Sequence, residues 1–301
     1  MARKKTWLDR RPISSCQLGV LHAFGPGALQ APNHMLEFRG SEVAGGRRLR
    51  VPLRGLRLVC LYGSVRVTVG AIRLITDAGA ALAYMSSSGL KTNGVLQPAT
   101  DAWKGRRYRQ FQAFQNQAWT LPQARRLVND KLRSQEDVLR YTRRQGRADQ
   151  RAAAFLGELP ALRRAVDAAR DHAMLLGLEG MATKRWFEVF GDLLPEGWTM
   201  PGRRKRPPTD PVNALLSLGY TLLFHRVQAA CQAWGLDPSL GFFHQYRPGR
   251  ASLACDLMEP FRVPAIDRLV LQKLAIKRYN QGDFIHEKKD SSVRMTEDAF
   301  K

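Results

Sequence analysis

The chain has 301 residues, of which 44% are hydrophobic, enough for a buried core and for two domains rather than one. Lys and Arg number 48 against 26 Asp and Glu, which gives a formal net charge of +22 at pH 7. This excess indicates a polyanionic partner, for which nucleic acid is the usual candidate. A membrane surface is the alternative, but no basic amphipathic helix or lipidation motif supports it.

Three features predict a cytoplasmic protein. The first residues, MARKKTWLDRRP, lack the apolar segment of a signal peptide. No uninterrupted apolar run is long enough to span a membrane. The cysteines are scattered without a C-x-x-C pair, which is typical of small core residues in a reducing compartment rather than of zinc ligands or disulfides. These cysteines are Cys16, Cys60, Cys231 and Cys255.

The first hundred residues are typical of a β-rich domain. Short β-prone runs are separated by Gly, Pro and Asn, at residues 18–24, 35–39, 48–52 and 56–62. Residues 65–78 predict a strand that turns into a helix, and residues 80–85 predict another buried strand.

After Pro98 the pattern changes to long basic helices, predicted at residues 103–117 and 121–146. Their cations either contact DNA or form a solvated face. We therefore expect an α+β fold, in which residues 1–100 form a small β-rich N-terminal domain and residues 101–301 a larger all-α domain. Residues 159–194 predict one or two more helices, with a break about Gly177–Gly180.

A basic, proline-rich segment, PGRRKRPPTD, precedes the most apolar helix of the sequence. Its cations fit either the phosphate backbone of DNA or a solvated linker, and both interpretations stay open. They are Arg203, Arg204, Lys205 and Arg206. Asp210 followed by proline is a helix start, which predicts a helix to about Trp234. Asp237 followed by proline repeats the signal and predicts a short helix that ends near His244.

The residues with the most chemical potential lie in the stretch 235–262, GLDPSLGFFHQYRPGRASLACDLMEPFR. Asp256 and Glu259 are three residues apart, so on a helix they project from one face, which is otherwise apolar. Burying unpaired carboxylates there costs several kcal/mol, roughly, unless a cation compensates. His244 precedes them, and imidazole with carboxylates suits Mn²⁺, Mg²⁺ or Zn²⁺. The stretch therefore predicts a divalent metal site.

Each of these residues also has an ordinary structural interpretation. A lone histidine such as His244 is more often hydrogen-bonded in a structural role than bound to metal, and Glu259 is able to pair with Arg262. Glu179, before a glycine in a helical region, is by itself typical of a solvated or capping residue. The remaining histidines have no carboxylate grouping and are interpreted as structural, namely His22, His34, His172, His225 and His286.

Four segments resemble one known family in their order and spacing. They are LEGMATKRWF (178–187), RPPTDPVNALLSLGY (206–220), GLDPSLGFFH (235–244) and SLACDLMEPFR (252–262). The family is the CRISPR spacer-acquisition integrase, also called the CRISPR-associated endonuclease of adaptation. The stretches LYGSVRVTVGAIRLI, RRYRQFQ and KLRSQ resemble its N-terminal half, so the similarity covers roughly residues 35 to 298.

The resemblance implies a metal-dependent DNA endonuclease and integrase. Glu179, His244 and Glu259 match the family's metal ligands, and Asp256 matches an acid to which we assign a supporting role. The expected cofactor is Mn²⁺ or Mg²⁺, held by a mixed carboxylate and imidazole set. The expected reaction inserts short DNA fragments (spacers) into the CRISPR repeat array, by attack of a 3′-hydroxyl on the repeat backbone. Trp186 stands where a tyrosine is common in the family.

The resemblance also implies partners. The β-rich domain is expected to mediate a homodimer, joined to the small second CRISPR adaptation protein and acting on double-stranded DNA, both the prespacer and the repeat. Tyr220 and Arg250 join the four cations of the basic segment as candidates for holding DNA. Two other functions stay open, a non-catalytic basic nucleic-acid scaffold and a general metal-dependent nuclease outside CRISPR.

Overall fold

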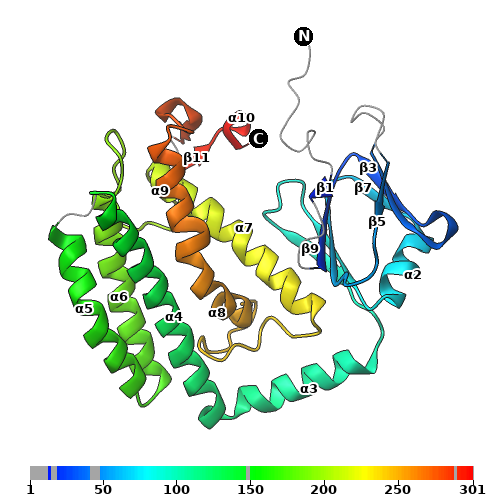
Figure 1. Ribbon diagram of the computed structural model, residues 1–301, viewed down its shortest axis with the longest axis horizontal. Coiled ribbons are helices and arrows are strands. Elements are labelled where there is room, and N and C mark those ends of the chain that lie inside the picture. Colours follow the sequence, from blue (N-terminus) through cyan, green and yellow to red (C-terminus); the bar gives the residue numbers. More distant parts are fainter. Residues whose placement is uncertain (1–12, 15–18, 41–47, 147–149, 288–289, 301) are drawn as a thin grey trace. The chain divides into compact units, whose positions relative to one another are not determined.

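A computed structural model describes residues 13–14, 19–40, 48–146, 150–287 and 290–300. Two compact units can be distinguished by their internal contacts. We call the first the β unit, which comprises residues up to 112 together with 224–240. The second, the helical unit, comprises residues 113–223 and 241–300. Figure 1 labels the helices and strands. Cys16 of the sequence analysis lies outside the described residues.

The β unit contains two sheets. The first has the order β1 (Ile13–Ser14), β2 (Val20–Phe24), β6 (Leu58–Tyr62), β8 (Ala81–Met85) and β9 (Thr92–Leu96). The second has the order β5 (Arg48–Val51), β4 (Leu36–Gly40), β3 (Gly27–Gln30) and β7 (Val65–Val67). Strands β2, β6 and β8 run parallel, whereas β1 and β9 pair antiparallel at the two edges.

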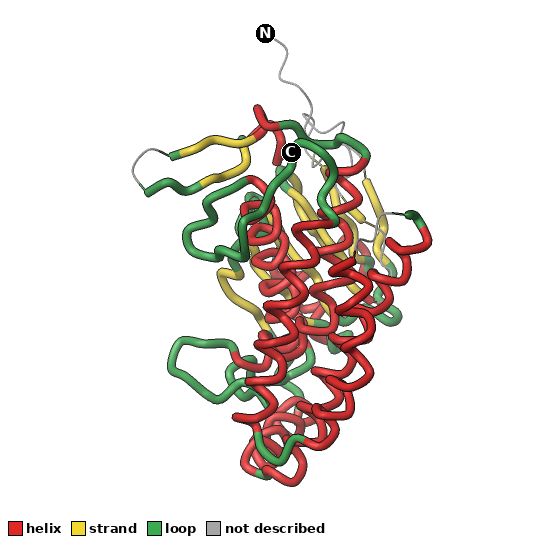
Figure 2. Tube along the Cα trace, turned by 90° about the vertical axis from the view of Figure 1, so that its left-hand side faces the viewer, coloured by secondary structure: helices red, strands yellow, loops and turns green. Residues whose placement is uncertain are grey.

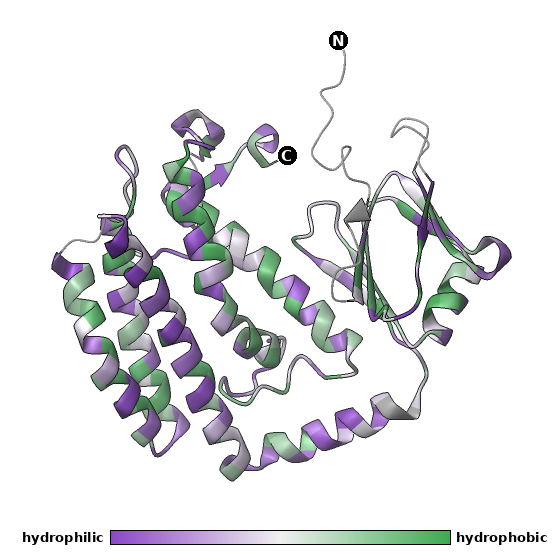
Figure 3. Ribbon diagram, viewed as in Figure 1, coloured by the Kyte–Doolittle hydropathy of each residue, from purple (hydrophilic) through white to green (hydrophobic). Residues whose placement is uncertain are grey.

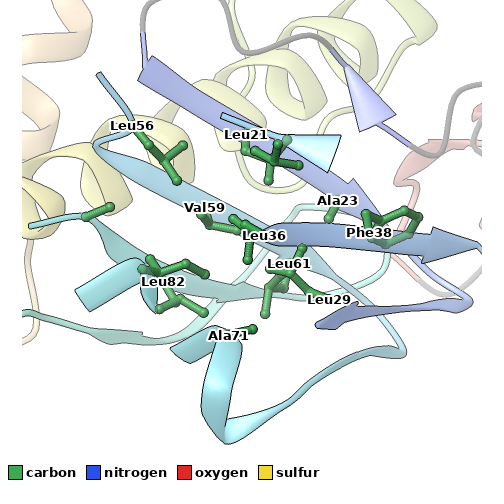
Figure 4. Packing of buried hydrophobic residues seen from close by; sticks show 13 residues of the cluster. Leu21, Ala23, Leu29, Leu36, Phe38, Leu56, Val59, Leu61, Ala71 and Leu82 are labelled. Carbon is green, nitrogen blue, oxygen red and sulfur yellow. The ribbon is translucent and has the colours of Figure 1, made fainter. Parts of the chain in front are cut away.

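The main core of the β unit is formed by both sheets and helix α2 (Val69–Asp77), as Figure 4 shows. Strand β6 is buried on both faces, which explains its uninterrupted apolar sequence LVCLY. Val59 and Leu61 face the main core. The alternate residues Leu58, Cys60 and Tyr62 face a second cluster with Trp103 and the end of α7 (Pro211–Ala233).

The second cluster bears on the domain boundary. It draws Trp103 of α3 (Asp101–Gln115) and Ala229 and Ala233 of α7 into the core of the β unit. A cut at residue 100 leaves these side chains out, so contacts extend the β unit beyond the predicted N-terminal domain. The predicted division of the chain into functional domains stays a prediction.

The helical unit is built around α4 (Gln117–Arg144). This helix packs against α5 (Gln150–Ala168), α6 (His172–Asp192), α8 (Ser252–Phe261) and the π-helical turn η4 (Arg262–Asp267). Helices α4, α5 and α6 lie side by side in Figures 1 and 2. Figure 3 shows hydrophilic and hydrophobic positions interleaved along them, as expected of helices with one buried face.

Shorter elements complete the described chain. They are η2 (Pro32–His34), α9 (Arg268–Ala275), η5 (Gln281–Asp283), the hairpin β10 (Phe284–His286) and β11 (Val293–Met295), and α10 (Glu297–Phe300). No helix in the described ranges has the length and apolar character needed to cross a membrane.

Two local predictions were wrong. Helix α6 continues through Gly177 and Gly180, because a glycine weakens a helix by about 1 kcal/mol without ending it. The break lies instead before His172, where the Asp171 side chain caps α6 by accepting from Met174 N at 2.8 Å. The short helix after Asp237 does not form, since the Asp237 side chain accepts from Ser239 N at 2.8 Å and makes a turn.

Candidate functional site

Two acidic residues from different helices meet at a single ammonium group inside the helical unit. Lys131 of α4 pairs with Glu179 of α6 through Nζ and Oε1, and its Nζ lies 2.7 Å from Oε2 of Glu259 on α8. Lys131 is 4% exposed and Glu259 5% exposed, while the Glu179 side chain is 18% exposed. The structure thus brings together two of the three predicted ligands, which are far apart in the sequence.

Each carboxylate has a second partner that fixes its orientation. Oε1 of Glu179 also accepts from Thr183 Oγ1, one turn further along α6, at 2.8 Å. Oε1 of Glu259 accepts from Arg262 Nη1 at 2.8 Å. Apart from the ion pair with Lys131, Oε2 of Glu259 has no hydrogen bond within the described part of the chain, although it is buried. This oxygen is therefore directed at a cation.

Both carboxylates are ionised at neutral pH. Burial raises the pKa of Glu259, but Lys131 and Arg262 outweigh it and lower that pKa to about 2. Burial and the neighbouring Glu259 raise the pKa of Glu179, but Lys131 holds it below its ordinary value. Ionised carboxylates are what a divalent ion requires of its ligands.

The third predicted ligand is held by a separate acid. Asp256 of α8 is fully buried, and its Oδ1 lies 2.6 Å from Nδ1 of His244. The same carboxylate accepts the backbone N–H groups of Phe242, Phe243 and His244 at 2.7, 2.9 and 3.0 Å. Asp256 therefore holds the irregular segment around His244 and orients its ring. With Nδ1 engaged, Nε2 is the ring nitrogen presented to a ligand.

The carboxylate pair at Lys131 and the pair of His244 with Asp256 each include one acid from the same turn of α8. Asp256 and Glu259 are three residues apart, which places their Cβ atoms roughly 5–6 Å from each other on one helix face. Among the described residues, no three His, Cys, Asp or Glu side chains form a group arranged to hold a metal ion. The ligand set of Glu179, His244 and Glu259 therefore stays a prediction.

A cavity of about 720 Å³ lies beside Glu179 in the helical unit. Gly180 and Thr183 of α6 line it, and Thr183 is the residue that donates to Glu179. Its other lining residues include four cations, Arg151, Lys184, Arg203 and Lys205, and two acids, Glu188 and Asp192, of which Asp192 pairs with Arg151 at 3.2 Å. The cations outnumber the acids in this lining, a balance that favours a negatively charged ligand such as a phosphate backbone.

Comparison with known proteins shows the family to which this chain belongs. A family model described as CRISPR associated protein Cas1 matches residues 21–301. The chain belongs to the Cas1 family. The family resemblance inferred from the sequence is thereby confirmed, and so is the α+β fold.

Individual members of the Cas1 family are similar over most of this chain. "CRISPR-associated endonuclease Cas1 3" from Thermus thermophilus is 35% identical over 237 residues, which are 78% of this chain and 68% of the relative. "CRISPR-associated endonuclease Cas1 2" from Rhodospirillum rubrum is 35% identical over 273 residues, which are 87% of this chain and 77% of the relative. A chain of a partial Cas6-RT-Cas1–Cas2 complex has a TM-score of 0.75 at 26% identity, covering 92% of this chain and 82% of that one.

In this member of the Cas1 family, the predicted DNA-binding residues differ in exposure. Arg204, Lys205 and Arg206 are exposed. Arg203 is half-buried, and its guanidinium donates to Asn213 Oδ1 at 2.7 Å and to Ser217 Oγ at 3.1 Å. Arg250, which precedes α8, is of intermediate exposure.

Tyr220 is buried, and its hydroxyl donates to Asp267, which also accepts from Trp186 Nε1 at 2.8 Å. Burial raises the pKa of Tyr220 well above its ordinary value and also raises that of Asp267. The Arg262 guanidinium lies 4.3 Å from the centroid of the Tyr220 ring. Tyr220 thus supports the arginine that pairs with Glu259.

Lys131 was missed by the sequence analysis. Its only signal is its position on the buried stripe of α4, where Leu127 and Val128 precede it by four and three residues and Gln135 follows by four. A lysine at such a position is expected to have a buried acidic partner. The sequence alone does not name that partner, because Glu179 and Glu259 come from other helices.

Proposed function

We propose that this chain is a metal-dependent DNA endonuclease and integrase of CRISPR adaptation, which inserts short DNA fragments into the repeat array. The observation that carries the proposal is the meeting of the ionised carboxylates of Glu179 and Glu259 at one cationic position. The curated relatives from Thermus thermophilus and Rhodospirillum rubrum, which are named CRISPR-associated endonucleases, support it.

The residues fit a divalent cation. Glu179 and Glu259 already converge on a positive charge, and Oε2 of Glu259 has no hydrogen bond to a described residue apart from its ion pair with Lys131. His244 donates through Nδ1 to the carboxylate of Asp256, which is the arrangement that metal-binding histidines usually have. Glu179, Glu259 and His244 would hold Mn²⁺ or Mg²⁺, the ions that a mixed carboxylate and imidazole set favours. The bound ion would polarise the scissile phosphate and stabilise its developing charge.

The residues around the ligands position the reaction. Thr183 and Arg262 fix the two carboxylates, and Asp256 fixes the imidazole of His244. The cations that line the neighbouring cavity bind the DNA backbone and hold the scissile phosphate against the site. Their contribution is orientation and charge neutralisation rather than proton transfer.

The reaction exchanges one phosphodiester for another. The 3′-oxygen of the fragment attacks the phosphorus of the repeat and forms a new P–O bond. The bond from that phosphorus to the 3′-oxygen of the repeat breaks, and the proton lost by the attacking hydroxyl is matched by one gained at the leaving oxygen. With water as the nucleophile, the same displacement is hydrolysis, which is the endonuclease reaction.

The proposal includes partners and a location. The similar chain of known structure belongs to a Cas6-RT-Cas1–Cas2 complex, which supports the small second CRISPR adaptation protein as partner here. We propose double-stranded prespacer and repeat DNA as substrates, a homodimer formed through the β unit, and a cytoplasmic location.

The deciding experiment uses branched DNA that mimics an integration intermediate. The full chain is incubated with it in Mn²⁺ or in EDTA, and rejoined and cleaved strands are separated on a denaturing gel. The wild-type protein is expected to rejoin strands in Mn²⁺ alone. Glu179→Gln is expected to lower the rate about 100-fold or more, because loss of a metal ligand exceeds the usual effect of its outer partners.

Glu158→Gln is the matched control, since Glu158 is an exposed acid on the neighbouring helix α5. It is expected to leave the rate unchanged. Cleavage without rejoining indicates a general metal-dependent nuclease. Unchanged activity of Glu179→Gln, or no activity in any form, contradicts the proposed function and favours a nucleic-acid scaffold.

A further inference from the structure

We propose that Lys131 is a built-in counter-ion of the metal site, which occupies the position between Glu179 and Glu259 and must be displaced when a divalent ion binds. This inference rests on the proposed function, because it assumes that the two carboxylates are metal ligands. It adds a residue that sets the metal affinity of the site and keeps the ligands in place before metal arrives.

The geometry gives Lys131 the position of a bound cation. Its side chain extends from α4 with 5% exposure, and Nζ contacts oxygens of both carboxylates. Oε2 of Glu259 has no other hydrogen bond to a described residue and lies 2.7 Å from this ammonium. A divalent ion that uses the same oxygens as ligands competes directly with Nζ.

Charge balance indicates that the Lys131 ammonium and a divalent ion do not occupy the site together. Without metal, the negative charges of Glu179 and Glu259 are balanced by Lys131 and by Arg262, which pairs with the other oxygen of Glu259. Adding a divalent ion while Lys131 stays would leave two cations on shared oxygens in a partly buried site, where repulsion is poorly screened. Lys131 therefore has to leave the carboxylates when the ion enters.

A second consequence is preorganisation. Two carboxylates in a buried site repel each other, and without a counter-ion they would move apart. The Lys131 ammonium contacts an oxygen of each carboxylate and so offsets this repulsion. The lysine therefore weakens metal binding but holds the ligand set ready for it.

The test is a titration of the full chain with Mn²⁺ in the absence of DNA. Binding is measured by calorimetry and, independently, by the electron paramagnetic resonance signal of the free ion. Lys131→Met is expected to lower the dissociation constant for Mn²⁺ at least tenfold, because the ion no longer displaces an ammonium. Lys131→Arg keeps the charge and is expected to show no gain. Arg133→Met removes a charge from the exposed face of α4 and is the control for net charge, with an unchanged affinity expected.

Weaker or unchanged Mn²⁺ binding by Lys131→Met overturns the inference. Circular dichroism shows whether the variant is folded, and Lys131→Gln, which keeps hydrogen-bond donors, takes its place if it is not. The wild-type protein provides an independent measurement. Saturating Mg²⁺ is expected to increase acylation of the Lys131 amine severalfold by mass spectrometry, while the exposed Lys184 is unaffected. Unchanged labelling of Lys131 also overturns the inference.

The failure of this inference differs from failure of the proposed function. If Glu179→Gln and Glu259→Gln abolish Mn²⁺ binding but Lys131→Met does not tighten it, only the role of Lys131 is wrong. If the wild-type protein binds no Mn²⁺, or binds it equally well without the two glutamates, the metal site itself is wrong and the inference falls with it.

Discussion

Asp256 organises more of the site than any other described acid. It is fully buried, and it receives three backbone N–H groups and the imidazole of His244. Gly241 allows the close approach, because a Cβ there would lie 2.6 Å from Oδ2 of Asp256. These contacts support the supporting role of Asp256, which stays a prediction.

Asp256→Asn is expected to lower the free energy of unfolding by roughly 2–4 kcal/mol. The asparagine replaces a buried charged acceptor by a neutral amide, whose N–H group would point at backbone N–H donors. Urea unfolding measures this change. The same variant is expected to weaken Mn²⁺ binding roughly 10- to 100-fold through the loss of His244 orientation. Asp130→Asn, at a partly exposed position of α4 whose side chain is 41% exposed, should change stability by less than about 0.5 kcal/mol. A loss below about 1 kcal/mol for Asp256→Asn would contradict this role.

At the scale of elements, the pairing of β2 with β6 contains a titratable contact. Nδ1 of His22 on β2 lies 3.0 Å from the hydroxyl of Tyr62 on β6. Burial, reinforced by Arg226, lowers the pKa of His22 from 6.5 to about 4. The fold therefore favours the neutral imidazole, as the structural interpretation of this histidine requires.

This contact predicts a pH-dependent stability. Because the pKa of His22 is lower in the folded state, its contribution is complete above the unfolded value of 6.5 and is lost as the pH falls toward 4. Between pH 7 and pH 4 the wild-type protein is expected to lose roughly 1–3 kcal/mol more than His22→Gln, after allowance for partial exposure. Unfolding in urea across this range measures the difference, and parallel pH profiles would contradict it.

Most elements could be predicted from local patterns, and the failures have physical causes. The helix after Asp210 and the helix that contains Asp256 follow from a clear start signal and from an apolar face. Strands β3 and β9 were not predicted, because each is short and owes its pairing to a neighbouring strand. The break at Gly177–Gly180 was misplaced because capping by Asp171 outweighs the low helix propensity of glycine.

The site could be predicted only in part. Glu259 and Asp256 follow from acids on an apolar helix face, but Glu179 has no local signal and was found through the family resemblance. Lys131 was missed because its partners lie on two other helices, so its role depends on tertiary contacts alone. That His244 lies outside a helix also depends on a tertiary contact, the carboxylate of Asp256.

At the scale of the whole molecule, the chain carries a net charge of +22, whereas acids gather at one place in the helical unit. The exposed cations of the segment that leads into α7 and those of the cavity beside Glu179 suit the backbone of DNA. The acids of the site are instead engaged with Lys131 and Arg262. A basic molecule with an inward-facing acidic site is what a metal-dependent enzyme of nucleic acid requires.

The most direct test of the metal site is anomalous diffraction at the manganese edge from crystals of the full chain soaked in Mn²⁺. We predict a manganese peak within coordination distance of the carboxylates of Glu179 and Glu259 and of Nε2 of His244. A peak only at other residues, or these three side chains without a shared peak at saturating Mn²⁺, would contradict the proposed metal centre.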